Sequence, residues 1–325
     1  MSESGEKTKY GTDYVKPRSK PRIYLARKFL AFVESYEGLM KKHAPKAFEV
    51  YSNLSTGTKL LYKEVQVYLN VSKRLNAGQP ASSLTRKELE VYYRVPNDIV
   101  HVAPALVIAA LPFTNYIIFP LLYLFPKKLL SPQYWTSRQL RYFEVARHLE
   151  RVQYHDNVLW HFERGNISDA DLKARSLEIV SLLRSGKQPS IEEILAIKPL
   201  FQDGGSFALH NLGYGHLRAL SLSHGIRYGG IMPYGKSWRF GGYLWEMDRG
   251  LAKESIAQLQ DDDLQQCCFM RGFNPVGLKR VEAEQYLDTW LRVSLELKDR
   301  ELSLLLHSPI LLAYNHKNNY GISFL

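Results

Sequence analysis

Three histidines, His148, His155 and His161, are the first candidates for metal binding. Zinc-binding histidines on one helix typically follow the HExxH pattern, in which two rings four residues apart share a face. The spacings here are seven and six residues, which does not match that pattern. We therefore interpret them as histidines at the surface or at the edge of the core, and we predict no metal site.

The run Asp261-Asp262-Asp263 is the second candidate, because calcium is bound by clustered carboxylates. An EF-hand loop that began at Asp261 would need glycine at its sixth position and glutamate at its twelfth. Gln266 and Gly272 stand there instead. The three acids are better explained by a helix start, where negative charge interacts favourably with the helix dipole, or by a solvated face.

The two cysteines of the chain, Cys267 and Cys268, are neighbours. Adjacent cysteines cannot cross-link distant segments, and their spacing matches no zinc site. We expect two small buried side chains on a helix that ends at Arg271-Gly272. Because the chain also has no glycine-rich phosphate loop and no serine nucleophile motif, the sequence predicts a protein that is not an enzyme and uses no cofactor.

Residues 216–253 mix basic and aromatic side chains, a combination that can bind RNA phosphates and stack on unpaired bases. The basic residues are Arg218, Arg227, Lys236, Arg239, Arg249 and Lys253, and the aromatic ones are Tyr228, Tyr234, Trp238, Phe240, Tyr243 and Trp245. An ordinary pair of packed helices with a solvated rim has the same composition. The sequence leaves both interpretations open.

The segment 99–126, IVHVAPALVIAALPFTNYIIFPLLYLFP, contains no Asp, Glu, Lys or Arg in 28 positions. As one helix it would be about 42 Å long, which exceeds the ~30 Å hydrocarbon core of a bilayer. Lys127 and Lys128 follow it, where their side chains can reach lipid headgroups. We predict a single transmembrane helix kinked by prolines; the alternatives are a re-entrant pair of short helices and a buried helix of a soluble domain.

The residues on which this membrane element is expected to depend are Pro104, Pro112, Phe113, Asn115 and Pro126. Thr114 and Asn115 would lie in the middle of the membrane, where unsatisfied polar groups are costly. We expect Asn115 to hydrogen-bond a neighbouring helix, to line a path, or to satisfy backbone groups that the prolines leave free.

The rest of the chain has the three- and four-residue apolar spacing of amphipathic helices, and the sequence predicts an all-α fold. Helices are expected over residues 25–40, 60–75, 137–165, 169–184, 248–270 and 280–297. Thr85 with Glu88, and Ser190 with Glu193, have capping-box spacing at helix starts. Pro96 is expected to stop or kink the helix that Thr85 opens.

Charge and composition divide the chain into four regions. They are a basic flexible N-terminus (1–22), a helical region (23–98), the transmembrane segment (99–126) and a C-terminal helical domain (127–325). Residues 1–98 carry 18 Lys and Arg against 10 Asp and Glu, whereas residues 127–325 carry 25 against 22. A basic leading region suits anionic lipid headgroups or a mitochondrial import signal better than base-specific DNA binding.

Several motifs resemble the LETM domain of mitochondrial inner-membrane proteins. Around the apolar segment these are Leu84-Thr-Arg-Lys-Glu88, Asp98, Pro104, Pro112-Phe113, Leu124-Phe-Pro126 and Leu129. A looser match follows at Leu217, Leu220, Gly225, Leu259-Gln-Asp-Asp-Asp-Leu264, Arg271-Gly272 and Leu287 to Leu291. The resemblance covers roughly residues 60–310 and is closest to the short LETM domain-containing members.

The resemblance implies a single pass through the mitochondrial inner membrane, with a C-terminal domain in the matrix that folds as helices in a 14-3-3-like arrangement. It also implies binding of mitochondrial ribosomes, contact with inner-membrane lipids, and a role in mitochondrial organisation and respiratory-chain biogenesis. On this basis we expect four arginines to bind the ribosome or another protein partner: Arg218, Arg227, Arg239 and Arg271.

Two alternative functions remain open. A cation/proton exchanger subunit would need a homo-oligomer, because one transmembrane helix cannot enclose a polar path. Long members of the family with proposed exchange have an acid where this chain has Asn115, and an amide cannot take up and release a proton near neutral pH. The second alternative is a soluble helical adaptor, which alkaline carbonate would release from membranes.

Overall fold

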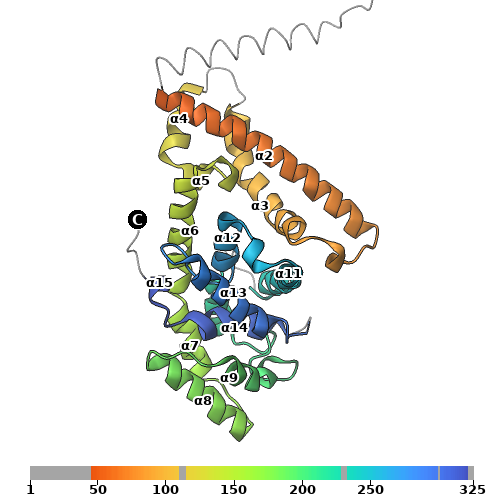
Figure 1. Cartoon of the computed structure of the whole chain (residues 1–325), viewed down its shortest axis with the longest axis vertical. Helices are drawn as coiled ribbons and strands as arrows, with labels where there is room; N and C mark the ends of the chain where they lie inside the picture. Colours follow the sequence, from red (N-terminus) through yellow and green to blue (C-terminus); the bar gives the residue numbers. More distant parts are fainter. Residues whose placement is uncertain (1–44, 110–114, 228–232, 299–300, 321–325) are drawn as a thin grey trace, which may run out of the picture. The chain divides into compact units, whose positions relative to one another are not determined.

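The computed structural model describes residues 45–109, 115–227, 233–298 and 301–320, and the described residues from 53 onward belong to one compact unit. Every element of the described residues is a helix, which confirms the predicted all-α class (Figure 1). The predictions for residues 1–22 and 25–40 lie outside the described residues, and the 14-3-3-like arrangement stays a prediction.

The α-helices are α2 (Pro45–Asn76), α3 (Arg86–Ala109), α4 (Asn115–Leu124), α5 (Pro126–Leu129), α6 (Ser137–Val152), α7 (His155–Glu163), α8 (Ala170–Arg184), α9 (Ile191–Ala196), α10 (Tyr214–Ser223), α11 (Tyr234–Lys253), α12 (Asp261–Met270), α13 (Arg280–Ser294), α14 (Leu302–Ala313) and α15 (Lys317–Tyr320). Short 3-10 helices are η1 (Ala81–Ser83), η2 (Pro132–Tyr134), η3 (Lys198–Phe201) and η4 (Ile256–Gln258).

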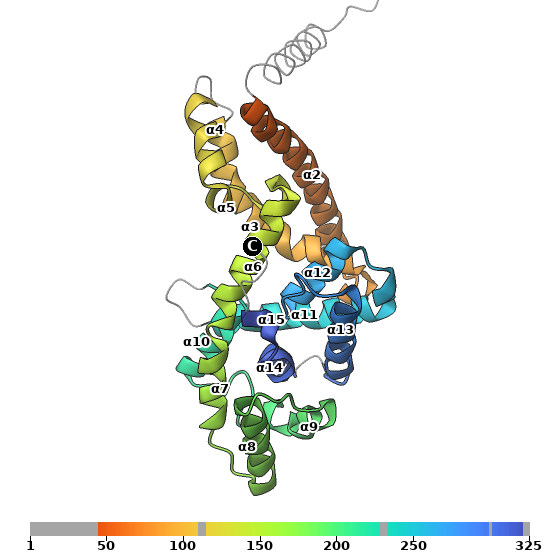
Figure 2. The same cartoon turned by 60° about the vertical axis from the view of Figure 1, so that its left-hand side comes forward.

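The apolar segment 99–126 forms two helices, so the single kinked helix that we predicted is wrong. α3 ends at Ala109 and α4 begins at Asn115, and the two pack side by side (Figure 2). Pro112 lies between them in the sequence, and proline lacks the N–H group that continues a helix. In the part of the chain that the structure describes, no helix has both the length and the hydrophobicity needed to cross a membrane.

Pro96 does not end α3, since the helix continues through Pro96 and Pro104 to Ala109. Of the two predicted outcomes, the stop is therefore wrong, and the kink stays a prediction. Side chains before and after the first proline are buried, with Val95 0% and Val102 1% exposed. Packing on both sides therefore outweighs the hydrogen bond that a proline removes from a helix interior.

The pair α3 and α4 buries one side and exposes the other. Its buried cluster, which extends to α2 and α6, consists of Leu61, Val102, Ala105, Ile118, Leu122, Leu130, Tyr134, Trp135 and Phe143. The exposed side chains of the pair and its exit are also large and apolar: Ile99, Val100, Val107, Ile108, Leu121, Tyr123, Leu124 and Phe125. We call this second set the apolar face.

The main core surrounds α14, whose sequence LSLLLHSPILLA is buried almost throughout. The helix has no exposed side because it packs against α7, α11, α13 and η3, and its polar residues Ser303, His307 and Ser308 are buried as well. A short run that is buried on every side lacks the alternation of apolar and polar residues that marks an amphipathic helix, so the sequence pattern does not predict this element.

The predicted helix 248–270 is instead the end of α11, the 3-10 helix η4 and all of α12. The break begins at Glu254, whose backbone is extended and whose carboxylate accepts a hydrogen bond from Arg86 Nε at 2.9 Å. Likewise, the predicted helix 137–165 is divided into α6 and α7.

The capping signals are confirmed. The backbone N–H of Glu88 donates to Thr85 Oγ1 (3.2 Å), and that of Thr85 donates to Glu88 Oε2 (2.9 Å). Ser190 and Glu193 form the same box at the start of α9. The three consecutive acids lie in the first turn of α12, and both cysteines of that helix are buried as predicted.

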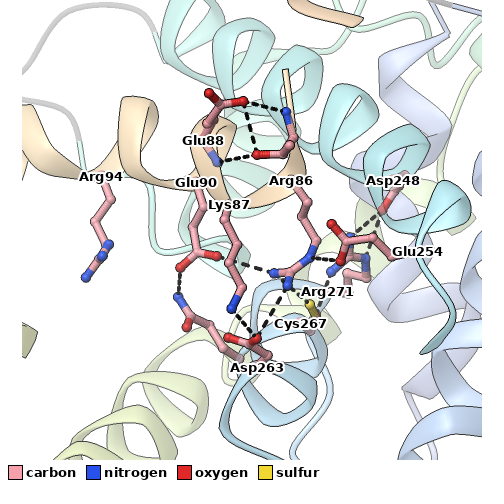
Figure 3. A network of polar contacts seen from close by, with 12 residues as sticks. Arg86, Lys87, Glu88, Glu90, Arg94, Asp248, Glu254, Asp263, Cys267 and Arg271 are labelled. Carbon is pink, nitrogen blue, oxygen red and sulfur yellow. Dashed lines mark hydrogen bonds and ion pairs between the residues drawn. The ribbon is translucent and has the colours of Figure 1, made fainter. Parts of the chain in front are cut away.

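Ion pairs of two buried arginines join α3, α11 and α12 (Figure 3). Arg86 is only 1% exposed and lies 2.9 Å from Glu254 and 3.6 Å from Asp263. Arg271 and Asp248 are both fully buried, 2.6 Å apart. The motif that begins at Leu84 is therefore explained by helix capping and by a buried charge network that fixes α3 to the domain.

Replacing Gly272 with alanine is expected to lower the free energy of unfolding by about 2–4 kcal/mol. Gly272 follows α12 with a φ of +76°, which disfavours other residues, and a Cβ there would lie 2.5 Å from Pro309 Cβ. Denaturant unfolding measures the loss. Gly242→Ala on α11 is the control, because its Cβ meets no atom within 4 Å, and it should be neutral or slightly stabilising. Equal unfolding midpoints for both variants would contradict the prediction.

Candidate functional site

Two adjoining hollows form the most basic concave surface that we identify. The first, of about 540 Å³, is lined by residues of α6 and by the segment after α10. The second, of about 530 Å³, is lined by α2, α3 and α11. Because Arg151, Gly225 and Arg227 line both, we treat the hollows as one site and call it the basic groove.

The basic groove carries a strong positive charge. Its Lys and Arg residues are Lys127, Arg147, Arg151, Arg227, Lys236 and Arg239. Among the described residues that line it, Glu150 is the only acid. Glu150 accepts hydrogen bonds from Lys127 (3.0 Å) and Arg227 (3.2 Å), and the bond from Lys127 is the main reason that its pKa lies below the ordinary value. Glu144, which does not line the groove, pairs with Arg147 at 2.7 Å, so two acids stand against the six cations and most of the positive charge is uncompensated.

Arg151 lies where the two hollows meet. Its Nη1 donates to the carbonyl oxygen of Phe269 at 3.3 Å, whereas its Nε has no hydrogen-bond partner in the described part of the chain. Gly225, with a φ of +70°, allows such a close approach that a Cβ there would lie 2.8 Å from that Nε. A partly buried guanidinium is screened less by water, so it strengthens the attraction of the groove for anions.

Tyrosines stand beside these cations. Tyr68 of α2 stacks on Tyr92 of α3 with ring centroids 5.4 Å apart, and Tyr93 stacks on Tyr243 of α11 at 4.0 Å. Tyr68, Tyr92 and Tyr93 line the basic groove. Exposed edges and faces of aromatic rings next to arginines are the usual platform for unpaired bases of a nucleic acid.

Two of the four arginines predicted to bind a partner lie in the basic groove. Arg227 is 85% exposed, and Arg239 is exposed on α11. Arg218 is exposed on α10 and lines a separate neighbouring hollow. Arg271 is fully buried against Asp248, so its prediction as a surface contact is wrong. A buried salt bridge to a residue 23 positions away cannot be recognised from the sequence around Arg271.

The sequence did not identify Arg147 and Arg151 as site residues. Their spacing of four places both on one face of α6, which is the available signal. That face also carries acids at Glu144 and Glu150, so it has the pattern of an ordinary solvated helix. Only the packing of α6 against α10 shows that Arg151 lines the same hollow as the tyrosines of α2 and α3, with Arg147 in the adjoining hollow.

The described residues among those predicted for the membrane element lie in three different helices. Pro104 is exposed within α3, Asn115 is the first residue of α4, and Pro126 opens α5. Pro112 and Phe113 lie outside the described residues.

The three histidines considered as metal ligands do not form a metal site. His148 and His155 are each 1% exposed, so their predicted position at the surface or core edge is wrong, while the ring of His161 stacks on that of His216 at 5.4 Å. Among the described residues, no group of three or more His, Cys, Asp or Glu side chains is placed to hold a metal ion.

Comparison with known proteins agrees with this architecture. A family model described as LETM1-like, RBD, matches residues 84–311, more than half of the chain. LETM1 domain-containing protein 1 of Xenopus tropicalis is 28% identical over 335 residues, covering 97% of this chain and 94% of that protein. The human protein of the same name is 28% identical over 303 residues, covering 90% and 82%. LETM1 domain-containing protein YLH47, mitochondrial, of Saccharomyces cerevisiae is 26% identical over 271 residues, covering 81% and 57%. This chain belongs to the LETM1-like RBD family.

Proposed function

We propose that this protein is a non-enzymatic anchor of the mitochondrial inner membrane, whose matrix domain docks mitochondrial ribosomes through the basic groove and so supports mitochondrial organisation and respiratory-chain biogenesis. The observation that carries the proposal is the groove itself, with six cations, one acid and adjacent tyrosines. The name of the yeast relative supports the mitochondrial part. The apolar face of α3 and α4 supports the membrane part.

Ribosomal RNA fits this surface better than an acidic protein does. Phosphates are held by clustered Lys and Arg side chains, and release of their counterions makes such binding strongly salt-dependent. Splayed bases stack on tyrosines, which an acidic protein surface would leave unused. The spacing of cations along two joined hollows provides contacts for several successive phosphates rather than for one anion.

Replacing Arg227 and Arg239 with glutamine together is expected to weaken binding to mitochondrial ribosomes at least about tenfold at physiological salt. The slope of log K against log salt should fall by about 1.4, because each lost phosphate contact on single-stranded nucleic acid accounts for about 0.7. Both side chains are exposed, so the fold should be retained. Co-sedimentation of the full chain with purified ribosomes over a salt series measures both values.

Arg175→Gln with Arg292→Gln is the matched control, because these arginines are 51% and 59% exposed on α8 and α13, outside the groove. It removes the same charge and should bind as the parent does. An equal loss in both double variants, or binding that does not depend on salt, would reject the groove as the docking site. Loss of binding to anionic vesicles with unchanged ribosome binding would show that the groove contacts lipid instead.

The exchanger alternative gains no support from the described residues. Asn115 begins α4, and its amide cannot carry a proton. The basic groove would repel cations rather than conduct them.

A further inference from the structure

The two ends of the apolar segment meet. Gln133, which follows the segment, donates from Nε2 to Asp98 Oδ2 (2.7 Å), which precedes it, and to Glu64 Oε2 of α2 (2.6 Å). Arg94 donates to Glu64 Oε1 at 2.6 Å on the same side. Gln133 and Asp98 are 9% and 8% exposed, so this junction is a packed part of the protein.

A single pass through a bilayer is incompatible with this junction. A helix formed by residues 99–126 would place Asp98 and Gln133 on opposite sides of a hydrocarbon core about 30 Å thick. The structure instead brings their side chains within hydrogen-bonding distance. Forming the hydrogen bond and crossing the membrane once are therefore mutually exclusive.

The dimensions of the helix pair match one leaflet. The part of α3 from Ile99 to Ala109 rises about 16 Å, and α4 rises about 15 Å, which is half of the hydrocarbon thickness. The five residues that join them, 110–114, carry no charge. The apolar face lies outside the buried cluster on α3 and, among the described side chains of α4, at Leu121, Tyr123 and Leu124, as a lipid-facing surface must.

Basic side chains lie where the chain leaves the α3–α4 pair, and they complement an anionic membrane surface. Lys128, Arg138 and Arg141 are exposed directly after the apolar segment, and Lys127 is half-buried beside them. Long basic side chains at this depth reach phosphate headgroups while their stems cover apolar surface. The apolar face and the basic residues beside it thus favour contact with an anionic lipid surface. A second copy of this chain would bring the same basic residues and would be repelled.

We propose that α3 and α4 form a re-entrant hairpin that enters one leaflet of an anionic bilayer and leaves from the same side. This inference rests on the membrane anchoring in the proposed function and specifies how the anchor enters the bilayer. It follows that η1, before the hairpin, and the whole C-terminal helical domain lie in the same compartment.

The test uses the full-length protein in mitochondria with one new cysteine either before or after the hairpin, Ser82→Cys or Ser185→Cys, at exposed positions. A membrane-impermeant maleimide is added to mitoplasts before and after detergent. The proposal expects both positions to react under the same condition, because they share one side. Labelling of one position in intact mitoplasts and of the other only after detergent would show a single pass and overturn the hairpin, while the anchoring itself would stand.

A second pair of variants tests the leaflet contact separately. Val107 is 64% exposed on α3, and Val107→Lys should weaken partitioning onto vesicles of phosphatidylcholine with phosphatidylglycerol on the order of 100-fold, because a charge is costly in hydrocarbon. The control Leu177→Lys, at a 43% exposed site on α8, should partition as the parent does. Release of the parent protein from mitochondrial membranes by alkaline carbonate would overturn the anchoring, and the hairpin with it. Unchanged partitioning of Val107→Lys would overturn the insertion of α3.

Discussion

Lowering the pH from 7 to 5 is expected to reduce the free energy of unfolding by about 2 kcal/mol for each histidine that is buried in its neutral form. Burial lowers the pKa of His148 and His155 to about 3 and that of His224 to about 4. Burial also lowers the pKa values of His216 and His307, whose Nε2 atoms are 3.0 Å apart. The combined effect of several such groups is comparable to the entire stability of an ordinary domain, about 5–15 kcal/mol.

The free energy of unfolding falls with the pH because the unfolded chain binds more protons than the folded protein. In the unfolded chain these histidines take up protons as the pH falls through about 6.5, whereas in the folded state they remain neutral until the pH approaches 3 or 4. The unfolded state therefore binds more protons, and stability is lost between these limits. Above pH 6.5 the contribution is fully present. We expect cooperative unfolding near pH 5, which circular dichroism melts over a pH series would detect.

His155→Leu separates this mechanism from general acid denaturation. Neither ring nitrogen of His155 has a hydrogen-bond partner in the described part of the chain, so leucine removes a poorly solvated polar ring without breaking a bond. The variant should be at least as stable as the parent at pH 7 and should lose about 1.4 kcal/mol less per pH unit between pH 6 and pH 4. His210→Leu, at a half-exposed histidine, is the control for exchanging a histidine for leucine outside the core. An unchanged slope for His155→Leu would show that protonation of this ring does not drive the transition.

Local signals predicted the ends of helices well. A capping box depends on two residues three positions apart, so Ser190 with Glu193 could be recognised without knowledge of the fold. Gly272 could be recognised for the same reason, because a left-handed residue after a helix is a property of that residue alone. These predictions needed no contact between distant parts of the chain.

The failures share one cause, which is the energy of contacts between distant segments. The sequence cannot show that packing carries α3 through Pro96, or that Gln133 returns to Asp98 and closes the helix pair. The sequence does predict part of the basic groove, because Arg227 and Arg239 both lie in the basic and aromatic region 216–253. The other part, on α2, α3 and α6, depends on which helix faces meet.

Asp248→Ala is expected to lower the free energy of unfolding by about 3–5 kcal/mol, because it leaves a fully buried guanidinium without its counter-ion. Asp248 Oδ1 accepts hydrogen bonds from Arg271 Nε (2.9 Å) and Nη2 (2.6 Å), and Oδ2 accepts from Trp290 Nε1 (2.9 Å) and from the Ser294 hydroxyl. The variant removes the acceptor of all four donors, each of which is buried away from water.

The comparison that isolates the buried charge is Asp248→Leu combined with Arg271→Met. Replacing both partners with apolar residues removes the attraction together with the cost of taking two charges out of water, so the double variant should be more stable than Asp248→Ala alone. Asp171→Ala, which breaks an exposed pair with Arg175 at 2.7 Å on α8, should change the stability by less than about 1 kcal/mol. Urea unfolding of the three variants gives the ranking. If Asp248→Ala unfolded at the midpoint of the parent, Arg271 would have to reach water or another acceptor, and the buried pair would not be what holds α11 to the end of α12.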